Sequence, residues 1–213
     1  MAREEVCRAY WQPVYSYFRA LGSDREDALD LTQELLADFC DGGGLGRVNP
    51  ETGSLRSYLK TTARHRLVNL HRDRSAKKRG GGAFQLALSE LDDASIPADP
   101  EMADTYYDRR WAWNLFRRAM DQLAEAYTSR GKGALFEALK PGLISQDALK
   151  PYAGIGAELG VGEAQIKLEV HRARKRLAEA LRREVAGTLE AEAEPAVVES
   201  ELRYLLRALA HGA

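Results

Sequence analysis

The chain has 213 residues, of which 31 are Lys or Arg and 32 are Asp or Glu, so its formal net charge is only -1. With 45% hydrophobic and 30% charged residues, the composition is that of one or two globular domains and not of a disordered chain. No uncharged stretch is long enough to cross a membrane, and Met1 is not followed by an apolar signal core. The sequence therefore predicts a cytoplasmic protein.

Three amphipathic helices are expected in the first part of the chain. Apolar residues recur at steps of three and four from Glu4 to Leu21, from about Asp24 to Cys40, and from about Ser54 to Leu70. Ser23 followed by Glu26 fits a capping box at the start of the second helix. The glycines within residues 42–46 mark a loop, and those at residues 80–82 mark the end of the helical segment. We therefore expect a first domain at residues 1–82.

The rest of the chain is expected to hold a linker, a second helical domain and a tail. Residues 83–100 are acidic, contain two prolines and show no sustained period, which favours a flexible linker. In the second domain, residues 101–189, one helix is expected around residues 111–123 and a shorter one before Pro141-Gly142. Residues 190–213 are expected to form an acidic tail with a short helix.

Residues 152–177 have the spacing of a helix-turn-helix, in which a glycine in the left-handed region joins a short helix to a longer basic one. A plain helical hairpin is the alternative. No segment alternates between apolar and polar residues as a half-buried strand does. The expected fold is therefore all-α, with two helical domains.

The neutral total conceals charged blocks. Residues 42–79 carry 10 basic and 2 acidic residues, residues 80–108 carry no basic and 7 acidic ones, and residues 163–183 carry 7 and 3. Because salt screens exposed charges beyond about 8 to 10 Å, such patches act separately. Two basic patches separated by an acidic segment are compatible with binding to a polyanion, the alternative being solvated charged helix faces.

Both basic patches lie on expected helices and contain residues that suit nucleic acid. Cations bind phosphates, whereas amides, guanidinium groups and aromatic rings read or stack on bases. The helix that follows Ser54 carries both kinds, which suits opened DNA. In the last basic helix, Ile166, Val170, Ala173 and Leu177 form a buried stripe, and the opposite face is free to enter a major groove.

An enzyme is not indicated, because the sequence has no nucleophile elbow and no phosphate-binding loop. Cys7 and Cys40 have no second ligand at metal-binding spacing. We therefore expect neither a metal nor a cofactor.

Three segments together resemble a known family. They are Asp27-Ala28-Leu29-Asp30-Leu31-Thr32-Gln33-Glu34, then Asn49-Pro50-Glu51-Thr52-Gly53-Ser54-Leu55-Arg56, and His171-Arg172-Ala173-Arg174-Lys175-Arg176-Leu177. In this order and spacing they resemble the extracytoplasmic-function (ECF) group of bacterial RNA polymerase sigma factors, in the sigma-70 family. Gly162 stands where the family usually has a Ser or Thr cap. Gly154 and Gly156 stand where it has helix formers, each expected to cost about 1 kcal/mol.

The resemblance implies that residues 1–82 are sigma region 2, which binds core RNA polymerase and the promoter -10 element, and residues 101–189 sigma region 4, which reads the -35 element. The residues implied in polymerase binding are Asp27, Asp30, Leu31, Gln33 and Glu34. Those implied at the -10 element are Asn49, Ser54, Arg56, Tyr58, Lys60, Arg64, Arg66, Asn69, Arg72 and Arg74. Those implied at the -35 element are Gln165, Lys167, Leu168, His171, Arg172 and Lys175.

The function that the sequence predicts is promoter-specific transcription initiation, including help in promoter melting. Core RNA polymerase and promoter DNA are the expected partners, and an anti-sigma factor is a further candidate. The alternative function is a free-standing helix-turn-helix regulator that binds duplex DNA without polymerase. A pure interaction module would instead show no salt-dependent DNA binding by either basic patch.

Overall fold

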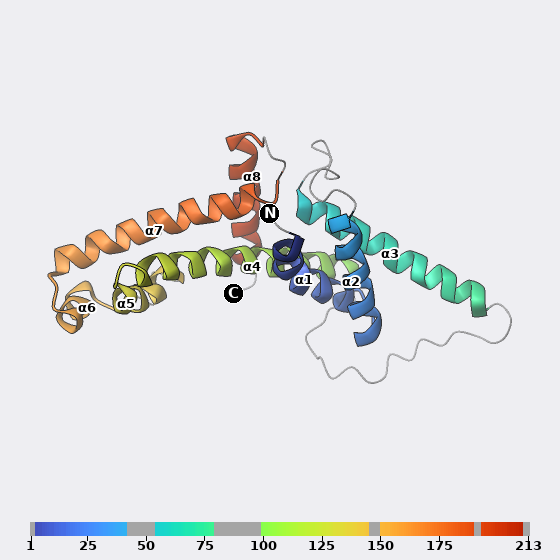
Figure 1. The fold of residues 1–213 in the computed structure, drawn as a ribbon, viewed down its shortest axis with the longest axis horizontal. Helices are drawn as coiled ribbons and strands as arrows, with labels where there is room; N and C mark the ends of the chain where they lie inside the picture. Colours follow the sequence, from blue (N-terminus) through green and yellow to red (C-terminus); the bar gives the residue numbers. More distant parts are fainter. Residues whose placement is uncertain (1–2, 42–53, 79–98, 145–149, 190–192, 211–213) are drawn as a thin grey trace. The chain divides into compact units, whose positions relative to one another are not determined.

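The protein is all-α, as predicted. The computed structural model describes residues 3–41, 54–78, 99–144, 150–189 and 193–210, and within these ranges it contains eight α-helices and no strand (Figure 1). Contacts divide the chain into two compact units, Met1–Asn114 with Gly187–Ala213, and Leu115–Ala186. None of the described helices is long and apolar enough to cross a membrane.

The first unit is built from three helices close in sequence, the first half of a fourth, and the last helix of the chain. Their bounds are α1 (Arg3–Ala20), α2 (Arg25–Asp41), α3 (Leu55–Lys78), α4 (Pro100–Thr128) as far as Asn114, and α8 (Pro195–Ala210). The bounds of α1 and α2 agree with the ranges that the apolar period predicts, and α3 begins where expected but continues beyond Leu70 to Lys78. The cap of α2 differs from the prediction: Asp24, rather than Ser23, accepts a hydrogen bond from the Asp27 amide at 2.8 Å.

Aromatic packing dominates the core of the first unit. Tyr10 stacks on Trp111 with ring centroids 4.5 Å apart, and Tyr17 packs against Tyr107 at 4.7 Å. All four rings are fully buried, and such pairs add about 0.5–1.5 kcal/mol to the free energy of area burial. The first half of α4 is thereby fixed against α1.

The second unit contains the second half of α4 together with α5 (Gly133–Ile144), α6 (Tyr152–Leu159) and α7 (Glu163–Ala186). Leu123, Phe136, Ile155 and Ile166, one from each helix, are buried in its core. The shorter predicted helix is longer than expected, because α5 continues through Pro141 to Ile144.

The division between the units lies within α4, after Asn114, and residues 187–213 group with the first unit. The change in composition at residues 83–100 predicts a domain boundary there instead. The two boundaries differ because composition shows where residue types change along the chain, and not which helices pack together. Most of that predicted linker, residues 83–98, lies outside the described residues.

Candidate functional site

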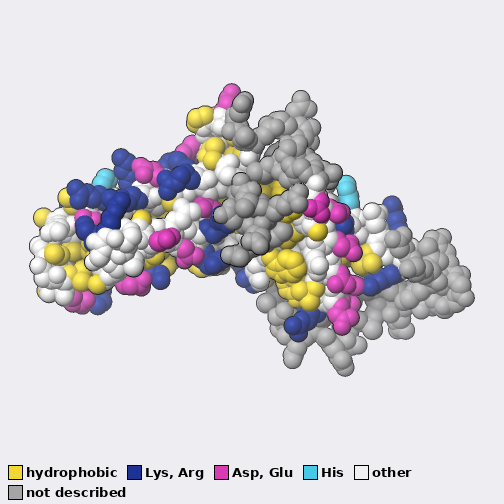
Figure 2. Space-filling model, in the orientation of Figure 1, with side chains coloured by type: hydrophobic (Ala, Val, Ile, Leu, Met, Phe, Trp, Pro, Cys, Tyr) yellow, Lys and Arg dark blue, Asp and Glu magenta, His cyan; other side chains and the backbone are white. Residues whose placement is uncertain are grey.

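The acidic residues of α2 lie on its solvent-facing side. Asp30, Gln33 and Glu34 are exposed and Asp27 is half-buried, whereas Leu31, the fifth residue of the predicted polymerase face, packs in the core. Figure 2 shows Asp and Glu side chains gathered along α2. The structure therefore brings four of the five predicted residues to one surface.

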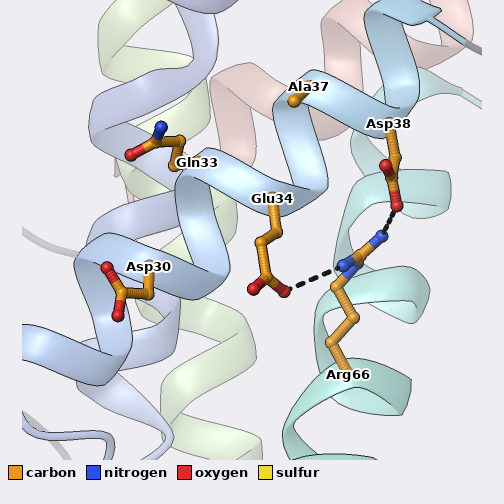
Figure 3. Close-up of a pocket in the computed structure, with 6 residues that line it drawn as sticks. All are labelled: Asp30, Gln33, Glu34, Ala37, Asp38 and Arg66. Carbon is orange, nitrogen blue, oxygen red and sulfur yellow. Dashed lines mark hydrogen bonds and ion pairs between the residues drawn. The ribbon is translucent and has the colours of Figure 1, made fainter.

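Two arginines of α3 pair with this surface. Arg66 binds both Glu34 and Asp38 from the neighbouring helix (Figure 3). Further along α3, Arg74 binds Asp27 with both terminal nitrogens, at 2.5 and 2.6 Å. Asp30 has no ion pair with any residue in the described part of the chain. It lines a pocket on the surface of α2, together with Gln33, Glu34, Ala37, Asp38 and Arg66 (Figure 3).

A second set of ion pairs joins α3 to α4. Arg56, Lys60 and Arg64 lie four residues apart, so they form one stripe of α3. Arg56 binds Asp108 at 2.6 Å, Lys60 lies 3.4 Å from both Asp108 and Asp104, and Arg64 binds Asp104 at 2.8 Å. Asp104 and Asp108, which belong to the acidic block of residues 80–108, thus neutralise part of the basic patch.

Burial and pairing change the acid–base properties of this set. Burial acts to lower the pKa of Arg56, but hydrogen bonds and charge from Glu201 and Asp108 outweigh it and hold that pKa above its ordinary value. The Tyr17 hydroxyl donates to Asp104 at 2.6 Å. Burial, followed by this carboxylate, raises the pKa of Tyr17. Both side chains therefore keep their protons through the physiological range.

The opposite stripe of α3 is open to solvent. Thr61, His65, Val68, Asn69 and Arg72 are all exposed, and Arg72 makes no ion pair within the described residues. Asn69 and Arg72 belong to the predicted -10 set. Thr61 and His65 do not, although their spacing of three and four from these residues shows that they share the face.

The remaining predicted -10 residues have other surroundings. Tyr58 is half-buried, with its ring 5.9 Å from that of Phe39. Ser54 is buried just before α3, where its backbone oxygen accepts the Tyr58 amide at 3.1 Å. Asn49, with the rest of the loop at residues 42–53, lies outside the described residues.

The predicted -35 residues share one face of α7. All six are exposed: Gln165, Lys167, Leu168, His171, Arg172 and Lys175. The expected stripe of Ile166, Val170, Ala173 and Leu177 is buried opposite them, as the helical period predicts. Figure 2 shows Lys and Arg side chains gathered over α7.

A buried carboxylate lies beneath this face, and the sequence patterns did not single it out. Glu169 is only 4% exposed. It accepts from Arg172 at 3.2 Å, and the Lys132 amine and Tyr127 hydroxyl lie 3.5 Å from it. Burial, followed by the Glu169 charge, raises the pKa of Tyr127. The signal that could have revealed Glu169 is an acidic residue within the apolar stripe of a basic helix.

The turn between α6 and α7 depends on two glycines. Gly160 has φ 68°, which confirms the predicted left-handed glycine. A Cβ added at Gly156 would lie 2.6 Å from the Val161 carbonyl oxygen, whereas one at Gly154 would meet nothing within 4 Å. At Gly156 the close turn therefore requires the absence of a side chain, whereas at Gly154 a side chain would fit and the expected cost of glycine stays a prediction. Gly162 precedes α7, and its carbonyl accepts the Gln165 amide at 3.0 Å.

Comparison with known protein families gives a match for one part of the chain. Residues 6–77 match the family model of sigma-70 region 2. These residues include most of α1, all of α2 and nearly all of α3. No curated protein and no solved structure matches the chain. The match shows that residues 6–77 are similar to sigma-70 region 2, and it does not extend to the rest of the chain.

Proposed function

We propose that this chain is an ECF-type sigma factor, a non-enzymatic and dissociable subunit that gives core RNA polymerase its specificity for promoters with a particular -10 and -35 element. The observation that carries the proposal is the region 2 match over residues 6–77. That match coincides with a helical unit whose α2 exposes carboxylates and whose α3 exposes polar and basic residues. The protein would act in the cytoplasm, where it needs no cofactor of its own.

The polymerase surface in this proposal is the α2 face of Asp27, Asp30, Gln33 and Glu34. Exposed carboxylates steer association with a basic partner and fix its register. Asp30 is the sharpest probe of this contact, because it is exposed and has no ion pair within the described residues. Glu34 already binds Arg66, so changing it also removes an ion pair between α2 and α3.

The -10 element is assigned to α3, with Asn69 and Arg72 as its most accessible contacts. An amide and a guanidinium group are suited to base edges and phosphates. The cations bound to carboxylates, such as Arg56 and Arg64, would have to exchange those partners for phosphates. Their role at the -10 element stays a prediction, as do those of Asn49, Ser54 and Tyr58.

The -35 element is assigned to the exposed face of α7, with α6, the turn and α7 acting as a helix-turn-helix. Such a motif inserts its second helix into the major groove, where the N-terminal residues reach base edges. Gln165, Lys167 and Arg172 have both the exposure and the chemistry for this contact. Since residues 6–77 do not include this region, a free-standing regulator that binds duplex DNA through α7 is the second candidate.

The two candidates differ in their binding to core RNA polymerase. A sigma factor must bind purified core enzyme and support run-off transcription from its own promoter, which a transcription-start map after overexpression would identify. Asp30→Arg should lower the affinity for core at least about tenfold, since it places a cation against a basic partner. Glu125→Arg, a matched charge reversal at an exposed residue of α4, should leave it unchanged. Specific binding to duplex DNA without binding to core would establish the regulator instead.

A further inference from the structure

The C-terminal segment of the chain returns to the first unit and contacts the beginning of α3. Residues 187–213 group with that unit by contacts. The Thr188 carbonyl accepts a hydrogen bond from the Leu55 amide at 3.0 Å, and both Thr188 and Leu189 are buried. Because the first amides of a helix have no partner within the helix, this segment supplies one from outside.

Helix α8 adds a side-chain clamp on the next residue. Glu201 accepts from Nε of Arg56 at 2.9 Å and from a terminal nitrogen at 3.4 Å. The guanidinium carbon of Arg56 lies 4.4 Å above the Tyr204 ring, and the Tyr204 hydroxyl donates to Asp108 at 2.5 Å. Leu202 and Leu205 anchor α8 by burial. Arg56 is thus held from α4 and α8 together.

The clamp is buried, which makes its parts interdependent. Side chains of Arg56, Asp108 and Glu201 are only 7%, 6% and 13% exposed. The Tyr107 hydroxyl also donates to the Arg56 carbonyl, at 3.2 Å. A buried ion pair that loses one partner leaves an uncompensated charge. Without Glu201, the Arg56 charge in the first turn of α3 would therefore lose one of its two anionic partners.

The clamp holds α3 by the stripe that faces α4, and not by the stripe of Asn69 and Arg72, the most accessible of the residues assigned to DNA. Arg56 belongs to the stripe that faces α4, whereas Thr61, His65, Asn69 and Arg72 are exposed on the opposite stripe. The docked α8 therefore supports the helix while this second stripe stays accessible. The contacts are those expected of a positioning element and not of a cover.

We propose that Thr188, Leu189 and α8 form a clasp that positions α3 for promoter opening, with Glu201 as its positioning residue. This inference rests on the proposed function of α3. It gives the C-terminal segment a role in the -10 step, although that segment follows the helix assigned to the -35 element. Loss of the clasp should loosen the first turns of α3 and weaken opening, while leaving binding of α7 to duplex DNA intact.

The test uses the full chain with Glu201→Gln, and Glu194→Gln as the matched control at an exposed residue just before α8. Amide hydrogen exchange of Leu55 to Leu59 should become roughly tenfold faster in Glu201→Gln, the factor expected for one lost charge-assisted hydrogen bond. Exchange in α7 should not change. Glu201→Asp, which keeps a carboxylate, should restore part of the protection, and Tyr204→Phe should give a smaller effect of the same sign.

The functional readout is the yield of open complexes with core enzyme, beside binding to a duplex that carries only the upstream element. Glu201→Gln should reduce opening and spare duplex binding. An unchanged yield of open complexes would overturn the proposal. An increased yield would also overturn it, because it would show that α8 blocks α3 instead of supporting it. Equal acceleration of exchange in α3 and α7 would also overturn it, as general destabilisation. If the unaltered chain fails to bind core, the proposed function fails, and the exchange of Leu55 to Leu59 still decides whether the clasp exists.

Discussion

Replacement of Asp108 by Asn tests whether the ion-pair stripe between α3 and α4 stabilises the first unit. Asp108 is buried and accepts from Arg56 at 2.6 Å, from Lys60 at 3.4 Å and from Tyr204 at 2.5 Å. Asparagine keeps the size and one oxygen but removes the charge, so Arg56 loses one of its two anionic partners. Removal of one member of a buried pair costs about 3–5 kcal/mol. Because Glu201 still binds Arg56, we expect the lower end, about 3 kcal/mol.

Tryptophan fluorescence during urea unfolding reports on the right unit, because Trp11, Trp111 and Trp113 all belong to Met1–Asn114. The variant should lower the free energy of unfolding of this unit by about 3 kcal/mol. Asp30→Asn, an exposed carboxylate of the same unit, should change it by less than about 0.5 kcal/mol. A loss below about 1 kcal/mol for Asp108→Asn would show that solvent or neighbouring groups compensate the charge, and would refute the reasoning.

Three further predictions concern the second unit and α8. Gly156→Ala should destabilise the second unit, since its Cβ would lie 2.6 Å from a backbone oxygen. Gly154→Ala should stabilise this unit by about 0.5–1 kcal/mol. Thermal unfolding followed by circular dichroism compares the two variants, and equal effects would contradict the close turn at Gly156. The Tyr204 pKa is raised to about 12, mainly by burial, from about 10 in the unfolded chain. Folding therefore favours the neutral form of Tyr204, so the free energy of unfolding should fall as the pH rises from about 10 to 12. Urea unfolding across this range should show a smaller fall in Tyr204→Phe. An identical fall in the variant would exclude Tyr204 as a cause. Lys167→Ala and Arg172→Ala should weaken binding to the upstream element and lower the salt dependence by about one phosphate contact each, with core affinity unchanged; fluorescence anisotropy at several salt concentrations measures this, and equal loss of core binding would point to misfolding.

Local patterns in the sequence were sufficient for the helices and for the face of α7. The period of three and four depends only on neighbouring residues, so it located α1, α2 and α3 and separated Lys167 from Ile166 on opposite sides of one helix. The helix-turn-helix spacing also predicted a glycine in the left-handed region, and the structure shows that this residue is Gly160. Asp24 shows its limit, because Ser23 and Asp24 are both good caps and the path of the chain decides between them.

The distribution of cations between DNA and protein partners could not be predicted in this way. Arg56 and Arg72 look alike in a helical pattern, yet Arg56 is bound to carboxylates 52 and 145 residues away in the sequence. In the sequence, the basic residues of 42–79 were compatible with an external polyanion or with solvated helix faces. Within the described residues, Asp27, Glu34, Asp104 and Asp108 from other helices pair with four arginines of this segment. Pairings between residues so far apart in the sequence leave no local pattern.

The shared helix α4 has a practical consequence for work with separate pieces of this protein. A fragment that ends in the segment 83–98 would lack Tyr107 and Trp111, and would leave the buried rings of Tyr10 and Tyr17 facing water. A fragment that begins at Pro100 would contain Tyr107 and Trp111 without the two tyrosine rings that cover them. Exposed patches of this kind favour self-association. Division of the chain at residues 83–100 would thus yield two fragments that tend to aggregate, whereas the intact chain keeps these rings buried.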